Sequence, residues 1–230
     1  ISAINDGRFY VLHRDHGYTS GSGWADPYFT TWSSIPSLTN IDKQPVIFSI
    51  NCHTGEYQIT ECFAEKLIRK SDGGAVGVFA AAYSSPSGYN DAFAMGLFDA
   101  IWSNPGLTPN FTGSGGSNTP PTPHSDIHTL GDVLNHGLLR HTQTWPGGVN
   151  YHEYELMHYF GDPAMRIWTA DPNLNVITAT HDTDINCNAT SFPVSGSTPG
   201  ALATLVYDDL LIGEVTLDGS GNGDIPYGIT

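Results

Sequence analysis

The chain has 230 residues, 39% of them hydrophobic, enough to bury the core of one large domain or of a medium and a small one. Eight Lys and Arg against 23 Asp and Glu give a formal charge of −15, too little positive charge for a face that binds nucleic acid or an anionic membrane. The sequence has no apolar run of about eighteen residues, so it predicts no membrane span.

Two apolar runs near the start of the chain are predicted strands that lead directly to reactive side chains. Residues 8–13 lead to His16 and Gly17, and residues 45–51, rich in β-branched side chains, lead to Cys52. One strand thus delivers an imidazole and the other a thiol. These are the parts of a cysteine nucleophile and its base.

The segments that follow alternate between helix and strand. In chain order we predict a helix over 61–70 capped by Thr60, with Glu65 and Arg69 paired, a strand over 75–80, helices beginning at Asn90 and Thr129, a helix over 151–160 and a last strand over 164–169. This α/β order indicates a mostly parallel sheet. Ligands of such sheets bind at the carboxyl ends of the strands, where His16 and Cys52 are expected.

The composition and hydrophobic pattern of the sequence change at Asp171. Beyond residue 175, β-prone segments over 176–180, 201–207 and 211–217 alternate with turn clusters and show no helical period. This pattern predicts a small antiparallel β-sandwich over 171–230. Because about sixty residues is short for that architecture, we expect a further strand or two after Thr230.

The three cysteines, Cys52, Cys62 and Cys187, are neither a disulfide framework nor a zinc-binding CxxC pair. A thiol beside an imidazole is suited to attack on a carbonyl carbon, and the imidazole then protonates the leaving amine. The N–H groups of Gly17 and Cys52 are candidate oxyanion donors. Each of these residues alone is more typical of a structural role. Their shared position at strand ends favours catalysis.

The histidines also raise the question of a metal site. His13 and His16 are three positions apart, and His53 is adjacent to Cys52, where it either shapes the cleft or acts as a second base. The sequence has no HExxH motif, and two later pairs, His136/His141 and His152/His158, lack the i, i+4 spacing of a helical metal pair. Metal-dependent catalysis is therefore disfavoured, and no metal ligands are assigned.

Five motifs, in their order along the chain, resemble the gingipain family of cysteine peptidases, within the caspase-like and legumain-like group. They lie at residues 15–17, 24–29, 45–55, 61–67 and 159–163. The resemblance implies a caspase-like three-layer α/β sandwich with a mostly parallel sheet over residues 1–170. It also implies an immunoglobulin-like β-sandwich over 171–230, in agreement with the change at Asp171.

The resemblance also assigns roles to individual residues. It implies that His16 is the general base and acid, that Cys52 is the nucleophile, and that the N–H groups of Gly17 and Cys52 form the oxyanion hole. The family's specificity pocket is lined by the loop corresponding here to Tyr83, Ser84 and Ser85, with His53 beside it. This loop departs from the gingipain sequences, so no residue preference at the cleavage site is carried over.

In gingipains the acid that orients the imidazole comes from well before the His-Gly pair. Asp6 and Asp15 are the only local acids before His16. We therefore expect a Cys/His dyad, and an upstream part of the same polypeptide associated with this chain. Family members bind calcium, so structural Ca²⁺ is compatible with the resemblance. Residues 218–222 resemble part of a calcium loop but lack its terminal glutamate, so a hairpin turn is favoured.

Together these observations predict a secreted or cell-surface cysteine endopeptidase of bacterial type, acting on protein or peptide substrates and needing no cofactor for the chemistry. Two alternatives stay open. One is a catalytically silent or adhesive protein that retains the fold. The other is a transpeptidase on the same fold, in which an amine rather than water resolves the acyl-enzyme.

Overall fold

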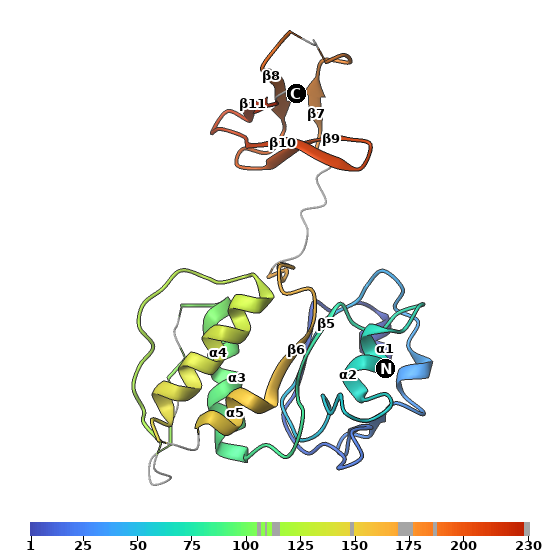
Figure 1. Cartoon of the computed structure of the whole chain (residues 1–230), viewed down its shortest axis with the longest axis vertical. Helices are drawn as coiled ribbons and strands as arrows, with labels where there is room; N and C mark the ends of the chain where they lie inside the picture. Colours follow the sequence, from blue (N-terminus) through green and yellow to red (C-terminus); the bar gives the residue numbers. More distant parts are fainter. Residues whose placement is uncertain are drawn as a thin grey trace. The chain divides into compact units, whose positions relative to one another are not determined.

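The computed structural model describes residues 1–104, 107–108, 110–111, 116–147, 150–169, 177–185 and 188–227 (Figure 1). The chain divides into two compact units, Ile1–Ala170 and Asp171–Thr230, which are described separately here. Within the described part of the chain, no helix has the length and apolar character needed to cross a membrane.

The first unit is built on a four-stranded sheet. Its strands are β1 (Tyr10–His13), β4 (Val46–Ser49), β5 (Gly77–Ala81) and β6 (Met157–Gly161), in the order β1-β4-β5-β6. The first three are parallel, and β6 runs antiparallel to β5. Every residue of β4 and β5 is buried, which explains why these strands read as continuous apolar runs.

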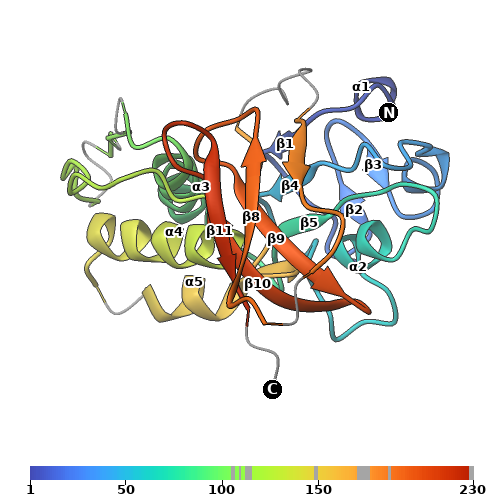
Figure 2. The same cartoon turned by 90° about the horizontal axis from the view of Figure 1, so that it is seen from above.

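Helices cover both faces of this sheet, as Figures 1 and 2 show. Helices α3 (Ser87–Ile101) and α4 (Leu130–Thr144) pack against the face that carries Phe48 and Phe79. Helix α2 (Phe63–Ile68) packs against the opposite face, which carries Ile47 and Val78. The predicted three-layer arrangement around a mostly parallel sheet is thereby confirmed. The smaller elements are α1 (Ser2–Asn5), β2 (Gly23–Trp24), β3 (Phe29–Thr30), η1 (Ile35–Ser37) and α5 (Asn150–Leu156).

The predicted helix over 151–160 is confirmed only as far as Leu156, and the predicted strand over 164–169 is wrong. Helix α5 ends at Leu156, and the chain continues directly as strand β6, paired with β5. Met157 and Tyr159 contact one apolar cluster and Phe160 contacts the other. This alternation between faces has the period of a strand, and it is the signal that the helical prediction missed. Residues 164–169 form only an isolated bridge, between Arg166 and Thr129.

Two helix starts also differ from the predictions. Cys62, not Thr60, is the N-cap of α2, because the Glu65 carboxylate accepts a hydrogen bond from the Cys62 N–H at 3.0 Å. Glu65 is therefore engaged in a capping box rather than paired with Arg69. Helix α3 begins at Ser87, with Pro86 as its N-cap, so Asn90 lies within the helix instead of capping it.

The second unit consists of two antiparallel sheets. One contains β11 (Asn222–Pro226), β8 (Ser191–Gly196) and β7 (Ala179–His181), and the other contains β9 (Leu202–Tyr207) and β10 (Leu210–Thr216). Residues of both sheets share one apolar core that includes Phe192, Val194 and Ile225. The three predicted β-prone segments overlap β7, β9 and β10, although residue 176 lies outside the described residues. Strands β8 and β11 are absent from the prediction because Pro, Gly, Ser and Asn give them the composition of turns.

Candidate active site

The ends of strands β1 and β4 bring His16 and Cys52 to the same edge of the sheet. The two strands are parallel neighbours in the register His13↔Ser49, so His16 and Cys52 each follow their strand by three residues. The Ile50 N–H donates to the His13 carbonyl at 2.9 Å, which extends the pairing beyond the strands. The predicted proximity of the two strand ends follows from this pairing.

Gly17 packs directly against the backbone of Cys52. A Cβ atom at position 17 would lie 2.1 Å from the Cys52 carbonyl oxygen, so no residue with a side chain fits there without moving the main chain. Within the described residues, neither the Gly17 N–H nor the Cys52 N–H donates a hydrogen bond to another protein group. These two N–H groups are the candidate oxyanion donors predicted from the sequence.

The His16 ring projects into solvent, with 86% of its side chain exposed. Its backbone is fixed, because the Ala25 N–H donates to the His16 carbonyl at 2.9 Å. The nearest carboxylate oxygen to the ring is Asp15 Oδ1, 3.8 Å from Nε2. Within the described part of the chain the ring makes no hydrogen bond to the Cys52 thiol. The structure therefore brings the two backbones together and leaves the imidazole free to turn.

The half-buried Cys52 thiol contacts the loop that precedes α3. The Ser85 N–H points at Sγ from 3.3 Å, and the Ser85 carbonyl oxygen lies 3.5 Å from it. Ser85 is in turn held by Asn90, whose side-chain amide donates to Ser85 Oγ at 2.8 Å. Ser85 thus touches the candidate nucleophile, and Asn90, which the sequence prediction places at a helix start, fixes its position.

His53 links the turn after Cys52 to the same loop. Its side chain is only 6% exposed, and its backbone is in the left-handed region with φ of 64°. Ring Nδ1 lies 2.8 Å from a Glu56 carboxylate oxygen, and Nε2 lies 2.9 Å from Ser84 Oγ. Since a carboxylate only accepts, a neutral ring donates through Nδ1 and accepts the Ser84 hydroxyl at Nε2. Both nitrogens are engaged, so the geometry favours a positioning role for His53. Tyr83 contacts the ring edge-on and is exposed.

A buried polar network beneath Cys52 is a feature that the sequence prediction missed. Ser49 Oγ accepts a hydrogen bond from the Trp24 indole at 2.8 Å and lies 3.0 Å from the Thr54 hydroxyl, which donates to Asn51 Oδ1 at 2.7 Å. The signal for it was the polar run Ser-Ile-Asn-Cys-His-Thr at the end of an apolar strand. Polar residues at the end of a buried strand need partners, and here they find them in one another.

A second buried histidine, His13, packs against this network through Trp24. His13 stacks on Trp24 with ring centroids 4.3 Å apart. Burial lowers the pKa of His13, an effect that outweighs a hydrogen bond with the His16 backbone, which raises it. His13 is therefore neutral and packed, and the exposed His16 is the histidine that a substrate can reach.

An ion pair ties the His16 strand to the pocket loop. Arg14 Nε donates to Asp91 Oδ1 at 2.7 Å, and an Arg14 Nη donates to the carbonyl and the hydroxyl of Ser87 at 2.7 and 2.8 Å. Arg14 follows β1 directly, while Ser87 and Asp91 begin helix α3. The loop that touches Cys52 is thus anchored to the strand that carries His16.

Cys62 does not compete with Cys52 for the role of nucleophile. Cys62 is buried at the start of α2, and burial raises the pKa of its thiol to about 11. Such a thiol is protonated and inert at neutral pH. Cys187 lies outside the described residues.

In the part of the chain that the structure describes, no metal-binding cluster is found at this edge of the sheet. Within the described residues, the one group of three or more side chains placed to hold a metal ion is Asp99, His124 and His136, none of which belongs to the Cys52 site. At residues 218–222, Asp218 Oδ1 accepts the N–H groups of Ser220 and Asn222 at 2.8 and 2.9 Å. This carboxylate therefore caps a turn.

Comparison with known proteins places these features in a family. The profile of peptidase family C25 matches residues 1–168. The fold is similar to that of the Arg-specific cysteine proteinase gingipain R (RgpB), with a TM-score of 0.81 and 22% identity, over 100% of this chain and 49% of the other. A comparison with curated proteins gives no significant match.

Two further solved structures show the same fold. The complex of the pro- and mature domains of Porphyromonas gingivalis RgpB has a TM-score of 0.78 at 22% identity, over 100% of this chain and 50% of the other. A structure described only as a protease has a TM-score of 0.72 at 22% identity, over 98% and 49%. The chain thus spans about half the length of the structures it matches. By the match over residues 1–168, the chain belongs to peptidase family C25, the gingipain family of cysteine peptidases.

Proposed function

We propose that this chain carries the catalytic centre of a cysteine endopeptidase that cleaves peptide bonds through a Cys52/His16 dyad. The observation that carries the proposal is the register of β1 and β4, which sets His16, Gly17 and Cys52 side by side at the carboxyl edge of the sheet. In open α/β sheets this edge is where ligands bind. Membership of family C25 gives the reaction class.

The proposed reaction begins when His16 accepts the thiol proton and Cys52 Sγ attacks the scissile carbonyl carbon. The negative charge that develops on the carbonyl oxygen is met by the N–H groups of Gly17 and Cys52. His16 then gives its proton to the departing amine as the C–N bond breaks, which leaves a thioester on Cys52. Water attacks the thioester with His16 as base, and the acid product leaves. The exposed His16 ring has the freedom that these proton transfers need.

Substrate selection is assigned in this proposal to the loop that contacts the thiol. Tyr83, Ser84, Ser85 and the adjoining His53 line the entry to Cys52. Ser84 and Ser85 are both held by hydrogen bonds, to His53 and Asn90 respectively, so the pocket wall is preorganised. The exposed Tyr83 ring is the side chain on this wall that is free to contact a substrate.

The proposal includes an upstream part of the same polypeptide as a partner. A pro-domain accompanies the mature domain in one of the matched structures. In this chain Tyr10 and Leu12 are exposed on β1, an outer strand of the described sheet. An upstream segment that packs there would also be able to supply an acid to orient His16. The extracellular or surface location of such peptidases and structural Ca²⁺ belong to the same proposal.

Covalent labelling tests the function. The protein is treated with acyloxymethyl-ketone probes bearing Arg, Lys, Asn or Asp, beside Cys52→Ala and, as a matched control, Cys62→Ala. We expect labelling of the wild type and of Cys62→Ala by one probe class, and none of Cys52→Ala. Labelling that persists in Cys52→Ala contradicts the assignment of the nucleophile. Failure of every probe favours the catalytically silent alternative. Peptide ligation in preference to hydrolysis, when an amine is added, favours the transpeptidase.

A further inference from the structure

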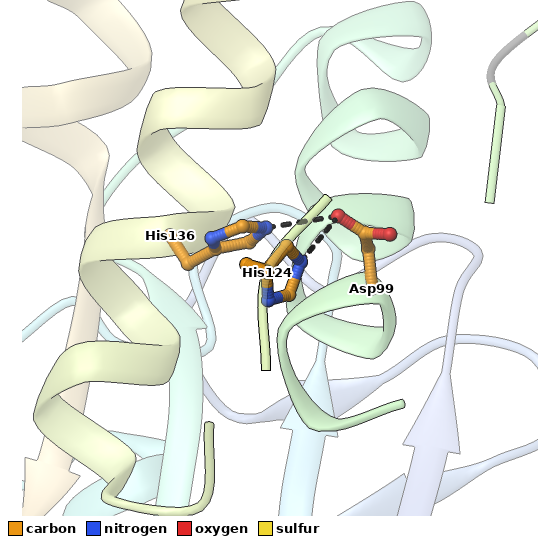
Figure 3. A group of neighbouring side chains, drawn as sticks. All are labelled: Asp99, His124 and His136. Carbon is orange, nitrogen blue, oxygen red and sulfur yellow. Dashed lines mark hydrogen bonds and ion pairs between the residues drawn. The ribbon is translucent and has the colours of Figure 1, made fainter. Parts of the chain in front are cut away.

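Two imidazole rings from separate segments approach one carboxylate oxygen, Asp99 Oδ2, in the helical layer (Figure 3). Asp99 comes from α3, His136 from α4 and His124 from the segment that precedes α4. His136 Nε2 lies 2.9 Å from Asp99 Oδ2, and His124 Nε2 lies 3.3 Å from the same atom. The two imidazole rings are close to each other, with centroids 4.4 Å apart. The candidate ligand atoms of the three side chains all lie within 4.8 Å of one another.

The helices that carry Asp99 and His136 are held close together by small residues. A Cβ atom at Gly96 would lie 2.9 Å from Gly137 Cα and 3.0 Å from the Gly137 carbonyl oxygen. Gly96 is one turn before Asp99, and Gly137 is next to His136. The two helix backbones thus meet at the level of the cluster, and their separation is fixed by contact of main chain with main chain.

The segment that carries His124 is anchored to the end of α3. The backbone and hydroxyl of Ser103 both donate to Asp126 Oδ1, at 2.9 and 2.7 Å. The Ile127 N–H donates to the Ala100 carbonyl at 2.7 Å. These contacts lie within three residues of His124 in the sequence. The histidine is therefore presented from a fixed backbone.

The hydrogen bonds of His124 determine which ring nitrogen carries its proton. Nδ1 lies 2.8 Å from the Ser125 carbonyl oxygen, and a carbonyl only accepts, so Nδ1 is the protonated nitrogen. In the neutral ring, Nε2 is then a bare acceptor, and it faces another acceptor, Asp99 Oδ2, at 3.3 Å. Two lone pairs at this distance repel unless a positive centre lies between them. A proton on either of these two atoms or a metal ion between them supplies it.

The other groups around the carboxylate bear on that choice. Asp99 is 1% exposed in its side chain, and its second oxygen, Oδ1, has no hydrogen-bond partner within the described residues. Arg140 Nε lies 3.8 Å from Oδ2, and its positive charge weakens cation binding. We therefore expect a site of micromolar rather than nanomolar affinity.

We propose that Asp99, His124 and His136 bind a divalent transition-metal ion of the zinc type. With zinc–ligand distances of about 2.0–2.1 Å, tetrahedral geometry separates neighbouring ligand atoms by about 3.3 Å. The 3.3 Å of the His124 contact meets this requirement, and the 2.9 Å of the His136 contact needs a small opening. The Nδ1 bond of His124 to a carbonyl is the outer contact that commonly orients a metal-binding imidazole. Two imidazoles favour zinc over calcium, which takes oxygen ligands.

The ion would add a direct link between three segments that are otherwise held together by packing and by the hydrogen bonds of Asp126 and Ile127. Such a link stabilises α3, α4 and the segment between them. The proposal concerns stability and is independent of the chemistry at Cys52. The two sites therefore succeed or fail in separate experiments.

Zinc titration tests the proposal. The protein is stripped with a chelator and titrated with Zn²⁺ in competition with a chromogenic chelator, in a Cys52→Ala background so that the half-buried Cys52 thiol binds no metal. His124→Gln and His136→Gln remove one ligand each. His128→Gln is the matched control, because it makes the same change four residues from His124, outside the cluster. Melting temperatures with and without Zn²⁺, and with millimolar Ca²⁺, are measured in parallel.

We expect one zinc ion per chain, a melting temperature raised by several degrees, and a loss of affinity of at least about tenfold in each ligand variant. The His128→Gln control should match the background, and Ca²⁺ should not compete. If His136→Gln fails to fold, His124→Gln decides the matter, because its side chain lies outside the helices. Absence of zinc binding at submillimolar concentrations, or equal affinity in the ligand variants and the control, overturns the proposal.

Discussion

The edge of the sheet at Cys52 and the cluster at Asp99 bring distant residues together in different ways. Parallel strands have a fixed register, so the residues that follow two neighbouring strands meet at one edge. Helix packing has no such rule, because the contact depends on which side chains face one another and on how closely the axes approach. Convergence at a sheet edge is therefore visible in a sequence, whereas convergence between helices appears only in the structure.

The largest effect is expected at the sheet edge from Gly17→Ala. The added Cβ would lie 2.1 Å from the Cys52 carbonyl oxygen, so the main chain must move at both candidate oxyanion donors. We expect peptide hydrolysis to fall at least about 100-fold and the free energy of unfolding to drop by about 2 kcal/mol. Initial rates and denaturant titration measure the two effects. Near-wild-type activity would show that the two strand ends do not form the site together.

Glu153 provides a contrast to Asp99, since it is a buried carboxylate without imidazole partners. Neither of its oxygens has a hydrogen-bond partner within the described residues. Burial raises the pKa of Glu153 from 4.5 to about 7, and the positive charge of Arg14 offsets only part of this. Because the folded pKa is the higher one, the protonated acid supports folding fully below pH 4.5, and this contribution is lost as the pH rises to about 7.

Glu153→Gln should therefore equal the wild type in stability near pH 4 and exceed it at pH 8, by up to roughly 3 kcal/mol. Urea titrations across that range measure the difference. A variant less stable than the wild type at pH 8 would mean that the carboxylate has a stabilising partner, with Arg14 the first candidate.

The helix contact near the cluster is tested by Gly96→Ala. The new Cβ would meet the backbone of α4 at Gly137, at 2.9 Å, and force the two helices apart. We expect a loss of about 1–3 kcal/mol in unfolding free energy together with weaker zinc binding, and unchanged labelling of Cys52. Gly88→Ala in the same helix is the control, because its Cβ would meet only the Trp145 ring, at 3.3 Å. Equal stability of the two variants would show that the crossing tolerates a wider spacing.

The smallest effect is expected from Ser84→Ala. This change removes the hydroxyl that His53 Nε2 contacts at 2.9 Å and so loosens one side of the pocket loop. We expect KM to rise by a few fold while kcat stays within about twofold, because the loop positions substrate and takes no part in proton transfer. Steady-state kinetics with the best peptide decide this. A large fall in kcat with KM unchanged would indicate a catalytic role for the Ser84–His53 pair.

The sequence supports the fold and the nucleophile more firmly than the surroundings of either. Strands β4 and β5 can be predicted because both are fully buried and almost entirely apolar, and β1 is apolar as well although Tyr10 and Leu12 are exposed. The start of α2 cannot be predicted in this way, because Cys62 is an unusual N-cap and Glu65 has two plausible partners. The sequence prediction places strand β6 in a helix, although the alternation of Met157, Tyr159 and Phe160 between faces has the period of a strand.

The candidate site shows the same division. The candidates His16, Gly17 and Cys52 follow two strands, so the sequence predicts that they share one edge of the sheet. The network of Trp24, Ser49 and Thr54 depends on side chains that are separated along the chain, so the sequence does not predict it. Spacing along the sequence gives no sign of the cluster at Asp99, because its three side chains belong to α3, α4 and an irregular segment.

The central claim, that His16 serves Cys52, is tested most directly by the rate constant for covalent labelling of Cys52 in wild type, His16→Ala and His53→Ala. His16 is exposed, so its removal should leave the fold intact and slow labelling by at least about 100-fold. His53→Ala should slow it by no more than about tenfold, through disorder of the pocket loop. Wild-type labelling in His16→Ala, or a complete loss confined to His53→Ala, would contradict the dyad.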